Sequence, residues 1–141
     1  MAKDIIEVAT ISDTGQKRSH NEDSAVTDSG LGLAIVADGM GGYKAGEVAS
    51  AIAAQLISNE VTAKAGRLDP NKSADASGLS PASIIVRDAI SRANSEVYRT
   101  AQEVPQCQGM GTTVVVVFYH KNRVSIAHVG DSRVYRMRGD E

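Results

Sequence analysis

The sequence of 141 residues has a single cysteine, Cys107, no tryptophan, and aromatic residues at only 4% of its positions. One cysteine cannot form a disulfide within the chain, so we expect a reducing, cytoplasmic setting. Because aromatic side chains are scarce, the core has to be built mainly from Val, Ile, Leu and Ala. The length is sufficient for one domain with a core of its own.

Blocks of positive charge and long apolar runs are also missing. The formal net charge is −2, and lysine and arginine do not gather in a block, so neither nucleic acid nor a membrane is expected as a partner. No run approaches the roughly 18 apolar residues that cross a bilayer. The first ten residues, MAKDIIEVAT, carry an early acid and no long apolar core, which argues against a signal peptide.

Two kinds of hydrophobic pattern alternate along the chain. Apolar residues recur every four positions from 48 to 56 and predict a helix over 46–61. Ser80 and Pro81 predict the start of a second helix, because serine is a favoured N-cap and proline suits the first helical position; Pro105 should end it. β-branched and alternating apolar residues predict strands. These strands are expected over residues 7–12, 24–27, 31–37, 114–118, 124–129 and 133–137.

The order of strands, a helical pair and more strands indicates an α+β fold with mostly antiparallel pairing. The strand at 31–37 is apolar throughout and is expected to be central. The polar stretch 67–80 is interpreted as a surface connection between the helices. The last predicted strand leads into Gly139-Asp140, a turn signal, and a strand that ends in a turn normally returns to a partner. We therefore expect a fragment of a larger domain, with a frayed charged tail as the alternative.

Asp38 stands directly after an apolar run, within the sequence VADGMGGYK. An Asp-Gly hairpin turn would need a strand directly afterwards, where a helix is predicted. A dinucleotide-binding loop would need glycine in place of Lys44, and a P-loop would need Gly-Lys-Ser/Thr. A carboxylate beside bare backbone carbonyls suits a hard cation. Metal binding and a structural role both remain open for Asp38 on these grounds.

Four other polar residues stand beside predicted strand ends. Asp131 lies in Gly130-Asp131-Ser132, which a turn alone would explain. Glu22 and Asp23 would also fit as solvated acids at the start of a strand, and Arg18 as a surface arginine. Strand ends are rigid supports, so several carboxylates and one arginine placed there favour a binding site more than any one of them does alone.

Four motifs in order carry a family resemblance: RSHNED at 18–23, VADGMGG at 36–42, GMGTT at 109–113 and VGDSR at 129–133. Together they resemble the metal-dependent protein phosphatase family (PPM, type 2C) of the bacterial kind. The resemblance implies an α-β-β-α layered sandwich of two antiparallel β-sheets flanked by helix pairs. It also implies phosphoserine and phosphothreonine protein substrates, and a serine/threonine kinase whose action the enzyme opposes.

The resemblance further implies a site with two or three Mn²⁺ or Mg²⁺ ions, in which a water between two metals attacks phosphorus. Asp38 would bridge the metals, and the Gly39 carbonyl and Glu22 would ligate the second. Asp23 would orient metal-bound waters, and Asp131 would contribute to a third metal site. Arg18 would hold the substrate phosphate, which its planar fork suits. The all-oxygen ligand set suits hard divalent ions.

Two departures from the family pattern limit these expectations. Some members carry histidine where this chain has Met40, so the general acid stays unassigned. The family domain is nearly twice as long, and its C-terminal half supplies two more aspartates. Residues 1–141 would then be the N-terminal portion of a single phosphatase domain that alone binds metal poorly and is inactive. There are two alternatives: a catalytically dead binding or regulatory module, and a hydrolase of small phosphoesters.

Overall fold

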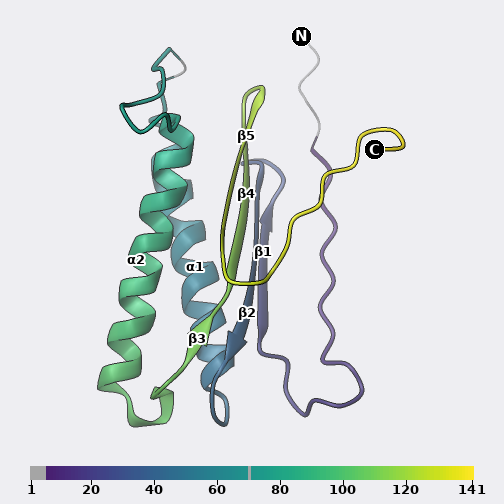
Figure 1. Ribbon diagram of the computed structural model, residues 1–141, viewed down its shortest axis with the longest axis vertical. Helices are drawn as coiled ribbons and strands as arrows, with labels where there is room; N and C mark the ends of the chain where they lie inside the picture. Colours follow the sequence, from purple (N-terminus) through teal and green to yellow (C-terminus); the bar gives the residue numbers. More distant parts are fainter. Residues whose placement is uncertain (1–5, 70) are drawn as a thin grey trace.

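The computed structural model describes residues 6–69 and 71–141. Its strands are β1 (Asp23–Asp28), β2 (Leu33–Met40), β3 (Gly111–Thr112), β4 (Val114–His120) and β5 (Arg123–Val129). The helices are α1 (Ala45–Ala65), α2 (Pro81–Glu103) and a 3-10 turn over Pro105–Cys107. The prediction of an α+β fold is confirmed, with strands, then the helical pair, then strands (Figure 1).

The strands form one antiparallel sheet in the order β1-β2-β4-β5, with the short β3 paired to the end of β2. β2 therefore lies inside the sheet, as its apolar sequence predicted. It runs three residues beyond the predicted end at residue 37, because Gly39 pairs with Thr112 and Met40 with Gly111. Asp38 consequently lies within a paired strand rather than just after one.

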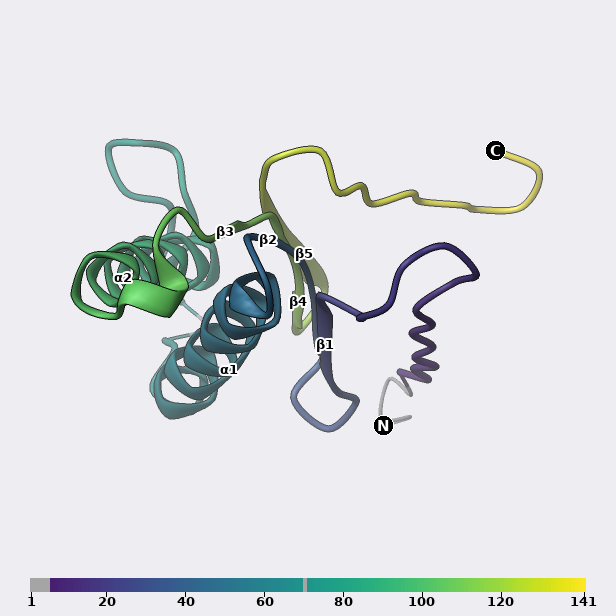
Figure 2. The same cartoon turned by 90° about the horizontal axis from the view of Figure 1, so that it is seen from below.

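Both helices cover the same face of the sheet (Figure 2). The core between them is aliphatic and alanine-rich, as the scarcity of aromatic residues predicted: Ile35, Ile57 and Val116 are at most 1% exposed. Small side chains along α1, among them Ala49 and Ala53, let it lie close to β2. Neither helix among the described residues combines the length and apolarity that a membrane crossing requires.

The start of α2 follows the predicted capping. The Ser80 side chain accepts a hydrogen bond from the backbone N–H of Ser83, and Pro81 occupies the first turn, where a missing N–H removes no helical bond. The helix ends at Glu103, just before Pro105. The first helix is longer than predicted and extends to Ala65, because one further buried position, Ala65, continues its apolar face.

Among the described residues, no helix or strand covers the other face of the sheet. Side chains alternate across a strand, so Val36 of β2 and Ile126 of β5 point away from the helices, and they are 48% and 52% exposed. The segments before β1 and after β5 run on this open side (Figure 2). The strands predicted over 7–12 and 133–137 fall in these segments and are wrong, because neither forms the ladder of hydrogen bonds that defines a strand.

Candidate metal centre

Strand register places two of the predicted acids opposite each other. Asp23, the first residue of β1, is the cross-strand partner of Asp38 in β2. Side chains of directly opposed residues share a face of the sheet, about 5 Å apart at Cβ, so both carboxylates lie on the open face. Both residues are exposed. Two acids as neighbours normally destabilise a sheet, which makes this pair a candidate for a cation site.

The pKa of Asp23 is raised above its ordinary value. Burial of the carboxyl is the largest cause, followed by the charge of Asp38 and a hydrogen bond shared with it, and then by the charge of Glu22. All of these causes raise the pKa, and no cation of the described residues is among them. A bound divalent cation would favour the charged form of both carboxylates, so the electrostatics fit the hard-cation site that the residue types predict.

Glycines bring the start of α1 against this end of the sheet. A Cβ on Gly39 would overlap the carbonyl oxygen of Gly46, the second residue of α1, and would lie 2.7 Å from the carbonyl oxygen of Glu22. A Cβ on Gly46 would lie 2.7 Å from the carboxyl carbon of Glu22. The N–H of Gly39 donates to the Glu22 carbonyl at 3.0 Å. The missing side chains therefore let Glu22, Gly39 and the helix converge beside Asp38.

The loop before β1 holds Glu22 and Asp23 in place through Asn21. The Asn21 amide donates to Ser12 Oγ at 2.7 Å, and its carbonyl oxygen accepts the N–H of Asp23 at 3.0 Å. His20 Nδ1 lies 3.8 Å from a Glu47 carboxylate oxygen, so the loop also reaches α1. Arg18 lies exposed in the same loop, four residues before Glu22. An exposed guanidinium in this loop is accessible to an anionic ligand.

Asp131 reaches this end of the sheet from β5. Val129, the last residue of β5, pairs with Val114, and Val115 pairs with Val36, so the turn at 130–132 follows the strand ends near Asp38. A hydrogen-bonded link joins the two regions: Thr113 Oγ1 accepts the N–H of Asp38 at 3.1 Å and lies 2.6 Å from Ser132 Oγ. Ser132, the neighbour of Asp131, is thus joined to Asp38 through Thr113.

Within residues 6–69 and 71–141, no three His, Cys, Asp or Glu side chains are assembled as a ready metal cluster. The chain presents an acid pair, a neighbouring Glu22 and an outlying Asp131. Such a set offers oxygen donors for a divalent ion without completing a coordination shell.

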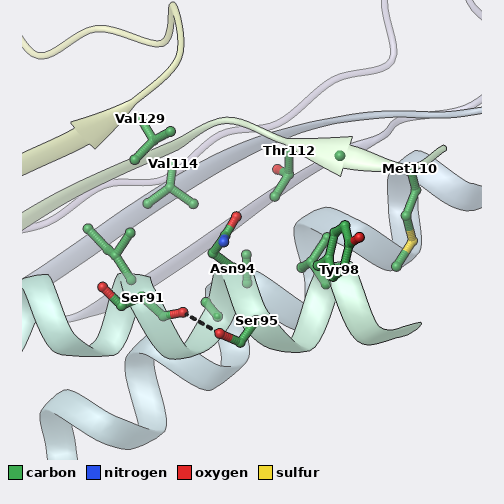
Figure 3. A pocket seen from close by; sticks show the side chains of 13 residues that line it. Ser91, Asn94, Ser95, Tyr98, Met110, Thr112, Val114 and Val129 are labelled. Carbon is green, nitrogen blue, oxygen red and sulfur yellow. Dashed lines mark hydrogen bonds between the residues drawn. The ribbon is translucent and has the colours of Figure 1, made fainter. Parts of the chain in front are cut away.

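A cavity of about 600 Å³ lies elsewhere, between α2 and the strands β3 to β5. Its wall combines apolar side chains such as Met110, Val114 and Val129 with Asn94 and Tyr98 (Figure 3). None of the predicted site residues lines it. Its lining has no carboxylate, so this cavity offers none of the oxygen ligands that the acid pair does.

Sequence reasoning missed three residues that shape the site. Asn21 and Thr113 lie in two of the four family motifs, but the sequence of a motif does not show which partner an amide or hydroxyl side chain bonds to. Gly46 carried a usable signal: a glycine in the first turn of a helix lowers helix stability by about 1 kcal/mol relative to alanine, which suggests that a close contact requires it.

Comparison with known proteins identifies the family of the chain. The profile of the family described as protein phosphatase 2C matches residues 14–141. The serine/threonine protein phosphatase PstP of Mycobacterium tuberculosis is 37% identical over 138 residues, which are 97% of this chain and 24% of that protein. The serine/threonine phosphatase stp of Listeria welshimeri is 34% identical over 131 residues, 91% of this chain and 48% of that protein.

Among solved structures, the catalytic domain of PstP in complex with two manganese ions superimposes with a TM-score of 0.68 at 34% identity. The match covers 93% of this chain and 50% of that domain. The chain thus spans a quarter to a half of the length of these relatives. With a family match over nearly all of its residues and the acid pair at the sheet's end, the chain belongs to the protein phosphatase 2C family.

Proposed function

We propose that this chain is the N-terminal half of a metal-dependent phosphatase domain that hydrolyses phosphoserine and phosphothreonine in proteins. The observation that carries the proposal is the register of β1 and β2, which opposes Asp23 and Asp38 on one face. The named activity of the relatives supports the reaction class, and the PstP complex with manganese supports Mn²⁺ as a cofactor, with Mg²⁺ as the chemical equivalent.

In this proposal Asp38, Glu22 and the Gly39 carbonyl hold the metal ions, Asp23 orients water beside them, and Asp131 serves an additional ion. Bound ions supply Lewis acidity that favours attack of water on phosphorus. Arg18 binds the phosphate through its planar guanidinium, which can form two parallel hydrogen bonds to phosphate oxygens. The hydrogen bonds of Asn21 and the packing of Gly39 on Gly46 keep the carboxylates in place while the substrate binds.

The open face of the sheet is where we expect the rest of the domain to pack. Half-exposed Val36, Tyr119, Val124 and Ile126 form an apolar surface that a second sheet would cover. We propose that the second half of the family domain packs there and brings the remaining metal ligands. Residues 1–141 alone would then bind metal weakly and show no turnover. The single cysteine favours a cytoplasmic location, where the substrates would be products of a serine/threonine kinase.

A chimera tests whether this half is competent. Residues 1–141 would replace the matching segment of the PstP catalytic domain, and hydrolysis of a phosphothreonine peptide would be measured with Mn²⁺. We expect turnover in the chimera and none in residues 1–141 alone. Asp38→Asn should lower turnover at least about a hundredfold, the scale that losing one charge-stabilising group costs in other active sites. Asp28→Asn, at the opposite end of β1, is the matched control.

Three outcomes would change the assignment. A folded chimera that binds Mn²⁺ but has no turnover would favour a binding or regulatory module. Hydrolysis of a small aryl phosphate without hydrolysis of the phosphopeptide would favour a phosphatase of small esters. Robust turnover by residues 1–141 alone would show that the acid pair and its neighbours are sufficient, contrary to the proposal.

A further inference from the structure

Thr113, between β3 and β4, forms a reciprocal pair of hydrogen bonds with Asp38. Its N–H donates to the Asp38 carbonyl oxygen at 2.9 Å, and its Oγ1 accepts the N–H of Asp38 at 3.1 Å. Both backbone groups of Asp38 are therefore bound to a single residue that lies 75 positions away in sequence. Two such bonds restrict rotation of the backbone from which the Asp38 carboxylate projects.

The same side chain supports the turn that carries Asp131. Thr113 Oγ1 lies 2.6 Å from Ser132 Oγ, and a hydroxyl can accept from a backbone N–H and still donate to, or accept from, a second hydroxyl. Gly130 lies against the other side of Thr113: its φ is +93°, and a Cβ there would lie 2.8 Å from Thr113 Cγ2. The hydroxyl and the methyl of Thr113 thus contact the residues on both sides of Asp131.

We propose that Thr113 is a positioning residue that fixes Asp38 and the Asp131 turn relative to each other, so that the two parts of the metal centre form together. The inference rests on the proposed metal site. Threonine is suited to this role because one side chain supplies a hydroxyl for two partners and a methyl for the close contact with Gly130. Valine has the same shape without the hydroxyl, and serine has the hydroxyl without the methyl.

Mn²⁺-induced broadening of amide NMR signals in ¹⁵N-labelled residues 1–141 tests the proposal, because it detects even weakly bound ions. In the wild type, we expect the amides of 37–39 and of 130–132 to broaden over the same Mn²⁺ range. Thr113→Val should require about tenfold more Mn²⁺ at 37–39, the lower end of what losing a residue that orients a metal ligand costs. Thr113→Ser should stay within about twofold of the wild type, since it keeps the hydroxyl.

Ser132→Ala isolates the second half of the link and does not disturb the pair with Asp38. It should raise the Mn²⁺ needed at 130–132 about fivefold, the equivalent of one hydrogen bond, and leave 37–39 unchanged. Thr27→Val is the matched control, because Thr27 lies in the same sheet at the end remote from Asp38 and its hydroxyl bonds only to Thr10 among the described residues. It should behave as the wild type.

The outcomes separate the two proposals. If the wild type shows no broadening near Asp38, the proposed metal site is wrong and the role of Thr113 fails with it. Suppose the wild type broadens there, but Thr113→Val at 37–39 and Ser132→Ala at 130–132 need the same Mn²⁺ concentrations as the wild type. The metal site then stands and the positioning role is overturned. If Thr113→Val does not fold, the response of Ser132→Ala decides.

Discussion

Replacing Gly39 by alanine should sharply destabilise the fold even though it adds only one methyl group. The added Cβ would overlap the carbonyl oxygen of Gly46 and would lie 2.7 Å from that of Glu22. Both neighbours are backbone atoms, so neither can rotate away as the end of a side chain would. The helix α1 would have to retreat from β2 by about 1 Å or more to restore ordinary contact distances.

The cost follows from what that retreat disrupts. Overpacking a close contact costs about 1–3 kcal/mol. The hydrogen bond from Gly39 N–H to the Glu22 carbonyl, at 3.0 Å, would also weaken, at about 1 kcal/mol. We therefore expect Gly39→Ala to lower the free energy of unfolding by about 2–4 kcal/mol. In a chain of this size a loss of 3 kcal/mol lowers Tm by roughly 10 °C.

Urea and thermal denaturation of residues 1–141, followed by circular dichroism, measure this effect without metal or substrate. Gly42→Ala is the matched control, because Gly42 is two residues beyond Met40 and a Cβ there meets no atom within 4 Å. It should change the free energy of unfolding by no more than about 0.5 kcal/mol. The reasoning is refuted if Gly39→Ala is as stable as the wild type, or if Gly42→Ala is equally damaging.

Two further predictions concern the two faces of the sheet. Because the pKa of Asp23 is raised in the fold, the folded state binds this proton more tightly, and the charged form destabilises the fold at neutral pH. Asp23→Asn should therefore raise the free energy of unfolding at pH 7 in EDTA. This gain should fade as the pH falls through the raised pKa. Urea denaturation at pH 7 and pH 3 measures it, and a larger gain at pH 3 would contradict the prediction. Ile35→Ala should cost about 2–5 kcal/mol, since Ile35 is 1% exposed, whereas its neighbour Val36, 48% exposed on the open face, should cost less than about 1 kcal/mol when changed to alanine. Equal losses in thermal denaturation would show that the open face is covered in solution.

Local features of the fold were predictable because they depend on residues that are close in sequence. The start of α2 follows from Ser80 and Pro81, its end from Pro105, and the hairpin of β4 and β5 from apolar runs around a polar turn. The motifs likewise indicated the family. Each of these signals spans a few residues, so hydrophobic periodicity and capping chemistry are sufficient to detect it.

The relations between distant segments were decided only by the tertiary structure. The alternation that predicted strands over 7–12 and 133–137 is a local property, but a strand exists only when a second backbone supplies its hydrogen bonds. Within the part of the chain that the structure describes, no backbone pairs with those segments. The register that opposes Asp23 to Asp38, the contact of Gly46 with Gly39, and the bonds of Thr113 join segments up to 75 residues apart. Such contacts depend on how the sheet and helices pack as a whole, so the residues next to a side chain in sequence do not determine them.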